Sequence, residues 1–188
     1  MKSLRLGLAI TGSYCSFGKL EAVLPEILAA FDVLPIFSEN ALLDSRFGTG
    51  ADWRARLEGA CGRPAVTDIA GAETLGPGGV LDALAIVPCT GNTLGKLSHG
   101  VTDTAVTMAA KGHLRNGKPL VIGVSTNDGL SGSAESIARL LNRKNVYFVP
   151  FGQDDPAAKP FSLSLDYGRI VPAILAALEG RQLQPVLI

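Results

Sequence analysis

The chain has 188 residues, enough to bury a sizeable core, and this length fits one domain over residues 1–188 better than two. Hydrophobic residues make up 47% and charged residues 18%, against about a quarter in typical soluble domains, so we expect a homo-oligomer whose subunits cover part of each other's surface. Lysine plus arginine number 17, as do aspartate plus glutamate, and this balance argues against nucleic acid or a membrane as partner.

No segment sustains the roughly 18 apolar residues needed to cross a bilayer, and three cysteines with no Cys-x-x-Cys pair suit reduced thiols. We therefore expect a cytoplasmic protein. Only two histidines accompany the cysteines, so a zinc site has little support. The two carboxylates of FGQDDPAAKP are read as part of a surface connection, and no metal ligand is assigned.

The predicted elements alternate between strand and helix. Short apolar runs predict buried parallel strands at LRLGLAI, VLPIF, LAIVP, PLVIGVS and VYFVPF, with a weaker sixth strand at PAVTDIA. Helical spacing or a serine cap predicts helices over 21–31, 102–114, 133–141 and 170–179. This order predicts a Rossmann-like, doubly wound α/β fold with a mostly parallel six-stranded sheet and helices on both faces.

Ligands of such sheets bind beyond the carboxyl ends of the strands, where four loops here are rich in Gly, Ser, Thr and Asn. In the first loop, Gly12 permits a close backbone approach, and Thr11 and Ser13 add hydroxyls beside a helix start, a combination that can bind phosphate. An ordinary serine-capped helix is the alternative. The spacing is not that of a P-loop, and Gly-x-Gly-x-x-Gly is absent, which argues against nucleoside triphosphate hydrolysis and a standard dinucleotide site.

The loop after the strand near Leu84 begins at Pro88. Thr90 and Asn92 offer donors and acceptors, Gly91 permits close approach, and Asn92 or Thr93 can cap a helix. These groups suit the edge of a planar polar ring.

AITGS and VPCTGNTLGKLSHGVTD together resemble the flavoprotein family of homo-oligomeric flavin-containing cysteine decarboxylases, whose second motif typically reads Pro-Ala-Ser/Thr-Ala-Asn-Thr followed by a helix and Gly-Ile/Val-Ala-Asp. The resemblance implies a Rossmann-like subunit, flavin mononucleotide (FMN) at a subunit interface, and threefold contacts. Cys89 and Gly91 stand where alanines are common in the family. With the adjoining loop residues, it implies a cofactor site made of Thr11, Gly12, Ser13, Ser38, Pro88, Thr90, Gly91, Asn92, Thr93 and Asp103.

Further stretches, DSRFGT, AVTMAAKGHLRNGKP, STNDGL, NVYFVPFGQDDP and ALEGRQLQPVLI, resemble the dipicolinate-forming branch of this family over nearly the whole chain. That branch implies a separate A subunit that binds NAD(P), and a joint function in oxidising a dihydrodipicolinate precursor during sporulation. Two alternatives stay open: a non-catalytic structural or allosteric partner with a vestigial flavin pocket, and an FMN-dependent decarboxylase of unknown substrate.

The family's cysteine decarboxylases use a histidine after the second or third strand and a Pro-x-Met-Asn clamp. Here His99 and His113 come late, in predicted helices, where we interpret both as surface residues, and the clamp position reads VSTNDGL with Asn127 in the amide role. Decarboxylation of cysteine is therefore disfavoured, and no catalytic acid or base is assigned.

A dicarboxylate substrate requires cations or backbone donors. Arg46 is the first candidate, because a guanidinium binds a carboxylate through two parallel hydrogen bonds; the alternative is a loop salt bridge with Asp44 or Asp52. Lys111 and Arg115 fit a solvated helix stripe better than a site.

Two other features of the loops favour packing over chemistry. Cys15 and Cys89 could form a redox pair, but packing as small residues is favoured, since no nearby cation or base is evident to activate either thiol. Trp53 could cover a pocket, although a packing anchor is the commoner role.

Overall fold

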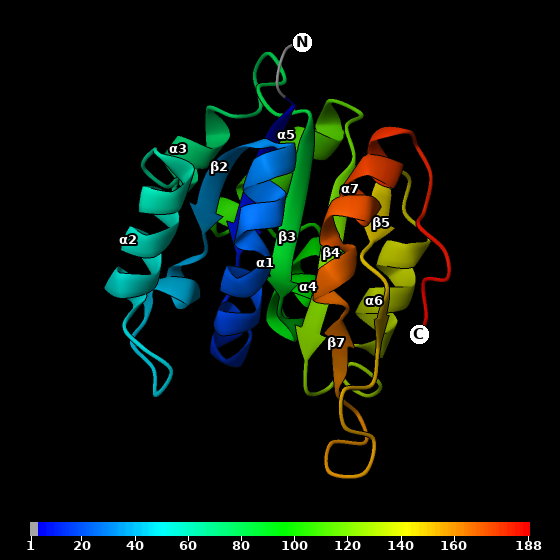
Figure 1. Cartoon of the computed structure of the whole chain (residues 1–188). Coiled ribbons are helices and arrows are strands. Elements are labelled where there is room, and N and C mark those ends of the chain that lie inside the picture. The colour runs from blue at the N-terminus through cyan, green and yellow to red at the C-terminus, as the bar shows by residue number, and fades with distance from the viewer. Residues whose placement is uncertain (1–3) are drawn as a thin grey trace.

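The uninterrupted apolar runs form the central strands of the computed structural model, which describes residues 4–188 (Figure 1). The parallel strands lie in the order β2-β1-β3-β4-β5, with bounds β1 Arg5–Ile10, β2 Asp32–Phe37, β3 Ala83–Cys89, β4 Leu120–Thr126 and β5 Val146–Phe148. The strand order reverses between β1 and β3, and doubly wound sheets bind their ligands at such a reversal. The predicted fold class is confirmed.

β4 divides between two partners, which adds an antiparallel edge. Its first three residues pair with β5, whereas Ser125 and Thr126 pair with β7 (Leu163–Leu165), which pairs in turn with β6 (Phe151–Gly152). The sheet therefore has seven strands. The run VYFVPF is divided between β5 and β6, since Pro150 has no N–H for a ladder. The run PAVTDIA contributes only an isolated bridge between Val66 and Ile36.

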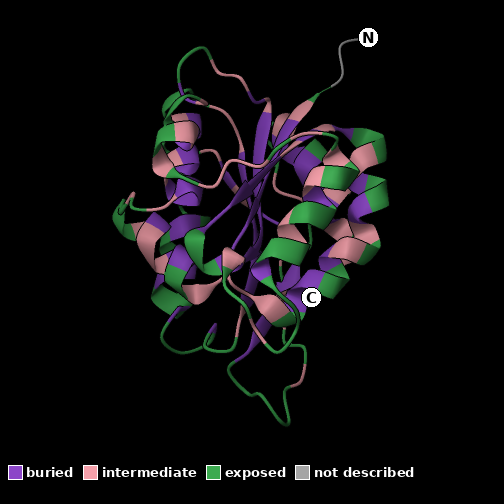
Figure 2. Ribbon diagram, turned by 90° about the vertical axis from the view of Figure 1, so that its left-hand side faces the viewer, coloured by how far each residue is buried: buried purple, intermediate pink, exposed green. Residues whose placement is uncertain are grey.

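Helices cover both faces of the sheet, and the strands between them are buried (Figure 2). One apolar cluster lies under α1 (Phe17–Ala30), α2 (Gly50–Cys61) and α7 (Ile170–Leu178). The other lies under α3 (Ile69–Glu73), α4 (Gly91–His99), α5 (Ala105–Arg115) and α6 (Ala134–Leu141).

The four predicted helices are present with shifted ends. α1 begins earlier, at Phe17, and α5 begins later, because Thr104 caps it in a reciprocal box with Thr107. No helix was predicted at α2, whose apolar pattern is weak, since it buries Leu57 but few other apolar side chains. Its Thr49 cap, which accepts from the Asp52 N–H, is the local feature that starts it.

The carboxyl ends of β1 to β4 meet at the lower edge of the sheet in Figure 1, and the loops that follow them gather there. Short 3-10 turns shape this edge: η1 (Tyr14–Ser16), η2 (Glu39–Leu42) and η3 (Tyr167–Arg169). None of the helices in residues 4–188 combines the length and apolar character needed to cross a membrane.

Candidate functional site

Thr11 joins the loops that follow β1 and β3. Its Oγ1 donates to the Pro88 carbonyl over 2.8 Å and accepts from the Thr90 N–H over 3.0 Å, and the Thr11 N–H also donates to Pro88 O over 3.3 Å. Thr11 is 1% exposed. Its hydroxyl is thus occupied within the protein, and Thr11 and Pro88 position the loops that carry the other predicted residues.

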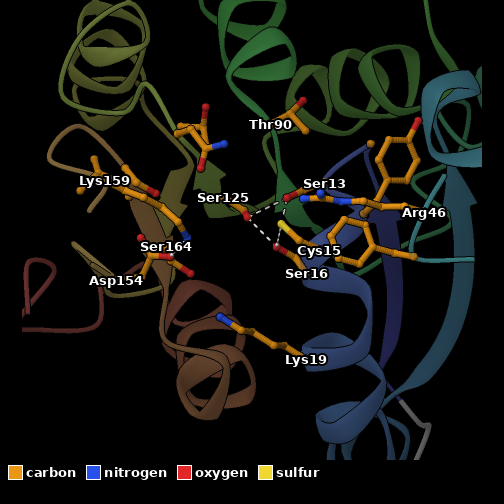
Figure 3. Close-up of a pocket in the computed structure, with 17 residues that line it drawn as sticks. Ser13, Cys15, Ser16, Lys19, Arg46, Thr90, Ser125, Asp154, Lys159 and Ser164 are labelled. Atoms are coloured by element: carbon orange, nitrogen blue, oxygen red, sulfur yellow. Dashed lines mark hydrogen bonds and ion pairs between the residues drawn. The ribbon is translucent and has the colours of Figure 1, made fainter. Parts of the chain in front are cut away.

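A first cavity of about 440 Å³ opens beside these loops (Figure 3). All four predicted strand-exit loops line it, and so does the β6–β7 hairpin. It brings together five predicted residues: Gly12, Ser13, Arg46, Thr90 and Asn127. The side chains that complete it come from residues not predicted to bind a ligand: Tyr14, Cys15, Ser16, Lys19, Phe47, Ser125, Thr126, Asp154, Lys159, Ser162, Leu163 and Ser164.

Three hydroxyl groups form a closed triangle in the wall of the first cavity. Ser13 Oγ lies 3.0 Å from Ser16 Oγ and 2.9 Å from Ser125 Oγ, and the latter two are 2.8 Å apart. The Tyr167 hydroxyl is fully buried with no hydrogen-bond partner among residues 4–188. Burial raises the pKa of Tyr167, and the Ser16 and Ser125 hydroxyls oppose that rise. The triangle and the phenol are neutral donors beside the cavity.

Positive charge dominates the first cavity. Arg46 stacks on the Phe47 ring, 4.9 Å from its centroid, and Lys19 lies 5.9 Å from the centroid of Tyr167. Neither cation has an ion-pair partner among residues 4–188, so the alternative salt bridge from Arg46 to Asp44 or Asp52 is not formed. Lys159 is paired, with Asp154 over 3.3 Å. Three cations against one carboxylate suit an anionic ligand.

A second cavity of about 400 Å³ adjoins the first and shares Gly12, Tyr14 and Thr90 as its wall. Ser38 lies in it, only 5% exposed, and its hydroxyl has no hydrogen-bond partner among residues 4–188. Three more predicted residues line it: Asn92, Thr93 and Asp103. The other lining residues were not predicted: Glu39, Asn40, Leu43, Lys96 and Thr104. The predicted residues therefore lie at one edge of the sheet, and all of them except Thr11, Pro88 and Gly91 line one or both of two neighbouring cavities.

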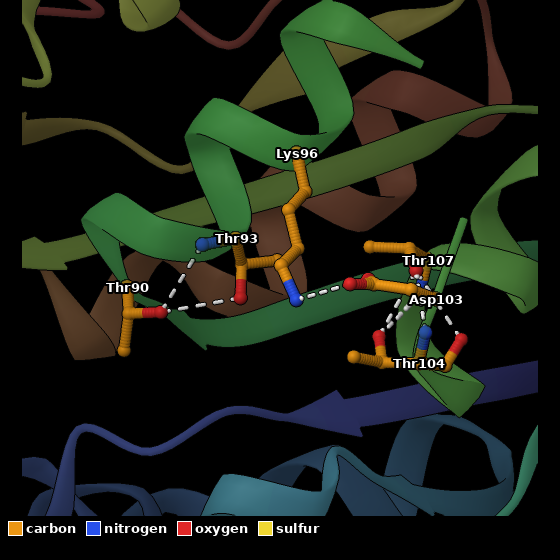
Figure 4. A network of polar contacts seen from close by, with 6 residues as sticks. All are labelled: Thr90, Thr93, Lys96, Asp103, Thr104 and Thr107. Atoms are coloured by element: carbon orange, nitrogen blue, oxygen red, sulfur yellow. Dashed lines mark hydrogen bonds and ion pairs between the residues drawn. The ribbon is translucent and has the colours of Figure 1, made fainter. Parts of the chain in front are cut away.

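The wall of the second cavity is held by helix caps and an ion pair (Figure 4). Thr90 Oγ1 accepts from the Thr93 N–H over 3.4 Å and lies 3.1 Å from Thr93 Oγ1. Lys96 Nζ donates to Asp103 Oδ2 over 2.9 Å. Lys96 was not predicted, although its position four residues after Asn92 places it on the same face of α4. Its charge is neutralised by Asp103, and Glu39 adds a carboxylate without an ion-pair partner among residues 4–188, so this cavity lacks the positive charge of the first.

Gly91 lines neither cavity and is required by packing. A Cβ there would lie 2.4 Å from Ser133 Oγ, 2.8 Å from Asp128 Oδ1 and 2.9 Å from Thr126 Oγ1. Asp128 Oδ1 accepts from the hydroxyls of both Ser133 and Thr126, and the Asp128 carbonyl accepts from the Ser133 N–H. This cluster orders the loop that carries Asn127, and it explains why glycine replaces the alanine common at this position.

The histidines lie away from both cavities. The surface interpretation is wrong for His113, which is 5% exposed because α5 packs it against the start of β4, where Nε2 lies 2.9 Å from the Pro119 carbonyl. Burial lowers the pKa of His113 to about 4. His99 is exposed, with Nδ1 2.9 Å from Gly95 O.

The remaining candidates adopt packing or surface positions. Cys15 is exposed and Cys89 is buried, and neither forms a disulfide. Burial raises the pKa of Cys89, so its thiol is inert. Trp53 packs edge-on against Phe17 with ring centroids 5.3 Å apart, the packing-anchor role. Residues 4–188 contain no cluster of His, Cys, Asp and Glu side chains that could hold a metal ion.

A family model described as "Flavoprotein" matches residues 1–147. The chain belongs to the flavoprotein family, the class indicated by the doubly wound sheet and the loop motifs at its carboxyl edge. It is 41% identical to the dipicolinate synthase B subunit of Bacillus subtilis strain 168 over 193 residues, which cover all of this chain and 95% of that protein. The family resemblance predicted from the motifs is confirmed.

Solved structures agree with this assignment. The crystal structure of the dipicolinate synthase B subunit from Bacillus halodurans is similar with a TM-score of 0.88 and 38% identity, over 100% of this chain and 98% of that one. The FMN-dependent cysteine decarboxylase SpaF has a TM-score of 0.67 at 18% identity, over 94% and 97% of the two chains, and shares the fold.

Proposed function

We propose that this chain is the B subunit of a dipicolinate synthase and that it works with a nicotinamide-binding A subunit in oxidising a dihydrodipicolinate precursor to dipicolinate during sporulation. The observation that carries the proposal is the full-length likeness to the B subunit of the Bacillus subtilis dipicolinate synthase, at 41% identity. The cavities at the carboxyl edge agree with it, since one is cationic and the other combines neutral polar groups with the Lys96–Asp103 ion pair and the carboxylate of Glu39.

The residues of the second cavity fit FMN. Ser38 offers a buried hydroxyl that no protein group uses, and a phosphate or ring oxygen would satisfy it. Asn92 and Thr93 present an amide and a hydroxyl from the first turn of α4, and Gly12 allows close approach. FMN, when bound, supplies an acceptor for two electrons. NAD(P) is assigned to the A subunit.

The residues of the first cavity fit a dicarboxylate. Arg46 is free to bind one carboxylate through two parallel hydrogen bonds, and Lys19 provides a second charge for the other. Asn127 adds an amide, and the Ser13, Ser16 and Ser125 hydroxyls can turn outward to donate. Gly12 and Thr90 line both cavities, so a dicarboxylate held in the first would lie next to a group held in the second. FMN there would supply the acceptor for the hydride that the ring loses on becoming aromatic, and the accompanying proton would pass to solvent.

A non-catalytic partner subunit is the second candidate. The observation in its favour is that neither histidine lines either cavity, so no imidazole is available there for proton transfer near neutral pH. A flavin-dependent decarboxylase with an unknown substrate is the third, on the fold shared with SpaF. In each case we propose a cytoplasmic homo-oligomer with threefold contacts.

Reconstitution separates these candidates. The purified chain is mixed with the A subunit, NAD(P)⁺ and freshly made precursor, and both dipicolinate and carbon dioxide are measured. Dipicolinate that needs both subunits and falls with Arg46→Ala supports the proposed function. Full rates with variants blocked at both cavities favour the non-catalytic partner, and carbon dioxide release favours the decarboxylase. No dipicolinate from the complete mixture contradicts the proposed function.

A further inference from the structure

Four cations without an ion-pair partner among residues 4–188 gather away from both cavities. They are Lys111 and Arg115 on α5, and Arg143 and Lys144 in the turn from α6 to β5. Lys111 and Arg115 are four residues apart on one face of α5. Arg143 and Lys144 come later in the chain, after β4 and α6. Folding thus brings two basic pairs from separate elements to one pocket.

These pairs line a groove of about 600 Å³, which we call the basic groove. Its apolar lining includes Leu97 and Leu114, together with Val101, which is 43% exposed. No aspartate or glutamate lines it, and it shares no lining residue with the first or second cavity. The groove therefore combines an apolar lining with positive charge from two separate elements.

One of the four cations is held in place by the fold. The Arg143 guanidinium donates to the Leu97 carbonyl over 3.1 Å, at the end of α4 where backbone carbonyls lack helical partners. Lys111 and Lys144 have no hydrogen-bond partner among the residues described, so their charges are available to a ligand. Like charges that face one groove repel each other, and an anionic occupant would relieve that repulsion.

We propose that the basic groove docks an acidic, amphipathic segment of the companion subunit, an inference that rests on the proposed function as one subunit of a two-subunit synthase. An apolar lining with cations from two elements matches a segment that presents apolar residues to the groove floor and carboxylates to the cations. The separation from both cavities lets such a segment bind while cofactor and substrate remain in place. The chain's zero formal charge gives no general attraction for nucleic acid, whereas a local groove suits a protein segment.

The test compares two variants with equal numbers of reversed charges. Lys111→Glu with Lys144→Glu changes one free cation from each of the two elements that line the basic groove, and Arg56→Glu with Arg181→Glu is the control on exposed residues elsewhere. Calorimetry at two salt concentrations follows the titration of each purified chain with the A subunit. Flavin uptake and dipicolinate binding by the chain alone are measured in parallel, because they test the proposed function without the partner.

We expect the groove variant to raise the Kd for the A subunit about tenfold or more and to weaken its salt dependence, while the control stays near the original value. In dipicolinate assays, the A-subunit concentration at half-maximal rate should rise equally, with the plateau rate kept. Equal Kd values for the groove and control variants would overturn the proposal. The proposal would also be overturned if the groove variant changed only the size of the homo-oligomer, because the groove would then bind a second copy of the chain. An equal loss of binding to a DNA duplex would likewise overturn it, because the groove would then bind nucleic acid.

Discussion

The two ends of the parallel sheet differ in how many of their polar side chains are hydrogen-bonded within the protein. At the amino end, the fold uses most of them: His113 contacts the Pro119 carbonyl, Lys118 Nζ donates to Gly79 O over 2.8 Å, and Asn116 Nδ2 donates to Gly76 O over 2.6 Å. Asp82 Oδ2 accepts from the Arg5 N–H over 2.8 Å. These bonds tie loops to strands and occupy these groups, and the cations of the basic groove, which precede β4 and β5, are the exception at this end.

At the carboxyl end, donors are left unused. Three of the four fully buried side-chain atoms without a partner in residues 4–188 lie there, in Ser38, Trp53 and Tyr167; the fourth is Arg5 Nε at the other end. Arg46 and Lys19 add charges without ion pairs. An unsatisfied buried polar group costs about 1–3 kcal/mol. Of these atoms only Ser38 Oγ belongs to a residue that lines one of the two cavities, so a ligand bound there would remove the cost at Ser38. Four variants test the contrast between the two ends of the sheet.

His113 tests the amino end and carries the largest expected effect. Its pKa of about 4 lies below the ordinary 6.5, so between these pH values the unfolded chain binds more protons than the folded one. The free energy of unfolding should therefore fall by about 3 kcal/mol as the pH drops from 6.5 to 4. Urea unfolding of the original chain and His113→Gln across this range should isolate that component. An identical pH dependence in both would contradict the assignment, and flavin binding at pH 7 should be unaffected.

Gly91 tests the packing behind the Asn127 loop. Gly91→Ala forces a methyl group against Ser133 and Asp128 and should cost about 2 kcal/mol, as overpacking does. Gly95→Ala is the matched control on α4, because its Cβ would meet nothing within 4 Å, and it should stabilise by about 0.5–1 kcal/mol. Thermal unfolding measures both. If Gly91→Ala unfolds at the same temperature as the original chain, contacts with the Asp128 cluster are not the reason that glycine occupies position 91.

Arg46 tests the charge of the first cavity. Arg46→Ala should weaken binding of dipicolinate about tenfold, since a partly exposed charged hydrogen bond contributes roughly 1.4 kcal/mol. FMN binding should be unchanged, because Arg46 does not line the second cavity. Arg56→Ala is the control, an exposed arginine outside both cavities. Calorimetric titration measures the affinity of each variant for each ligand. If Arg46→Ala weakened the binding of both dipicolinate and FMN, the assignment of the two ligands to separate cavities would be wrong.

Ser38 should give the smallest effect and the most specific one. Ser38→Ala removes an unpartnered buried hydroxyl, so the ligand-free chain should unfold at the same or a slightly higher temperature. FMN binding should weaken about fivefold, for a loss of roughly 1 kcal/mol. Parallel melting curves with and without FMN show whether the two effects have opposite sign. If Ser38→Ala lowers the unfolding temperature of the ligand-free protein and leaves the FMN affinity unchanged, the Ser38 hydroxyl stabilises the fold and does not bind FMN.

Local sequence patterns predicted the five parallel strands, the doubly wound fold and the loops that meet at the carboxyl edge, but the strand predicted at PAVTDIA was wrong, since only an isolated bridge forms there. They could not predict β6 and β7, which are too short to leave a periodic pattern, and so missed Lys159 and Ser164 in the first cavity. Ser16 and Ser125 are more than 100 positions apart, and only the register of the sheet brings their hydroxyls together.

Residue type alone also misjudged some roles. Gly91 was expected to approach a ligand, but the structure surrounds it with the Asp128 cluster. His113 was expected on the surface, but it is buried because it shares the inward face of α5 with Val106, Ala109 and Ala110, at i, i+3, i+4 and i+7 spacing.

The central claim is that flavin and dicarboxylate bind side by side at the carboxyl edge of the sheet. The most direct measurement is the visible absorption spectrum of the chain, loaded with FMN, passed through gel filtration and then titrated with dipicolinate. The account predicts that the flavin band is retained and shifts saturably with the diacid, with a weaker response in Arg46→Ala. Flavin that is lost on the column, or a retained band that dipicolinate leaves unchanged, would contradict it.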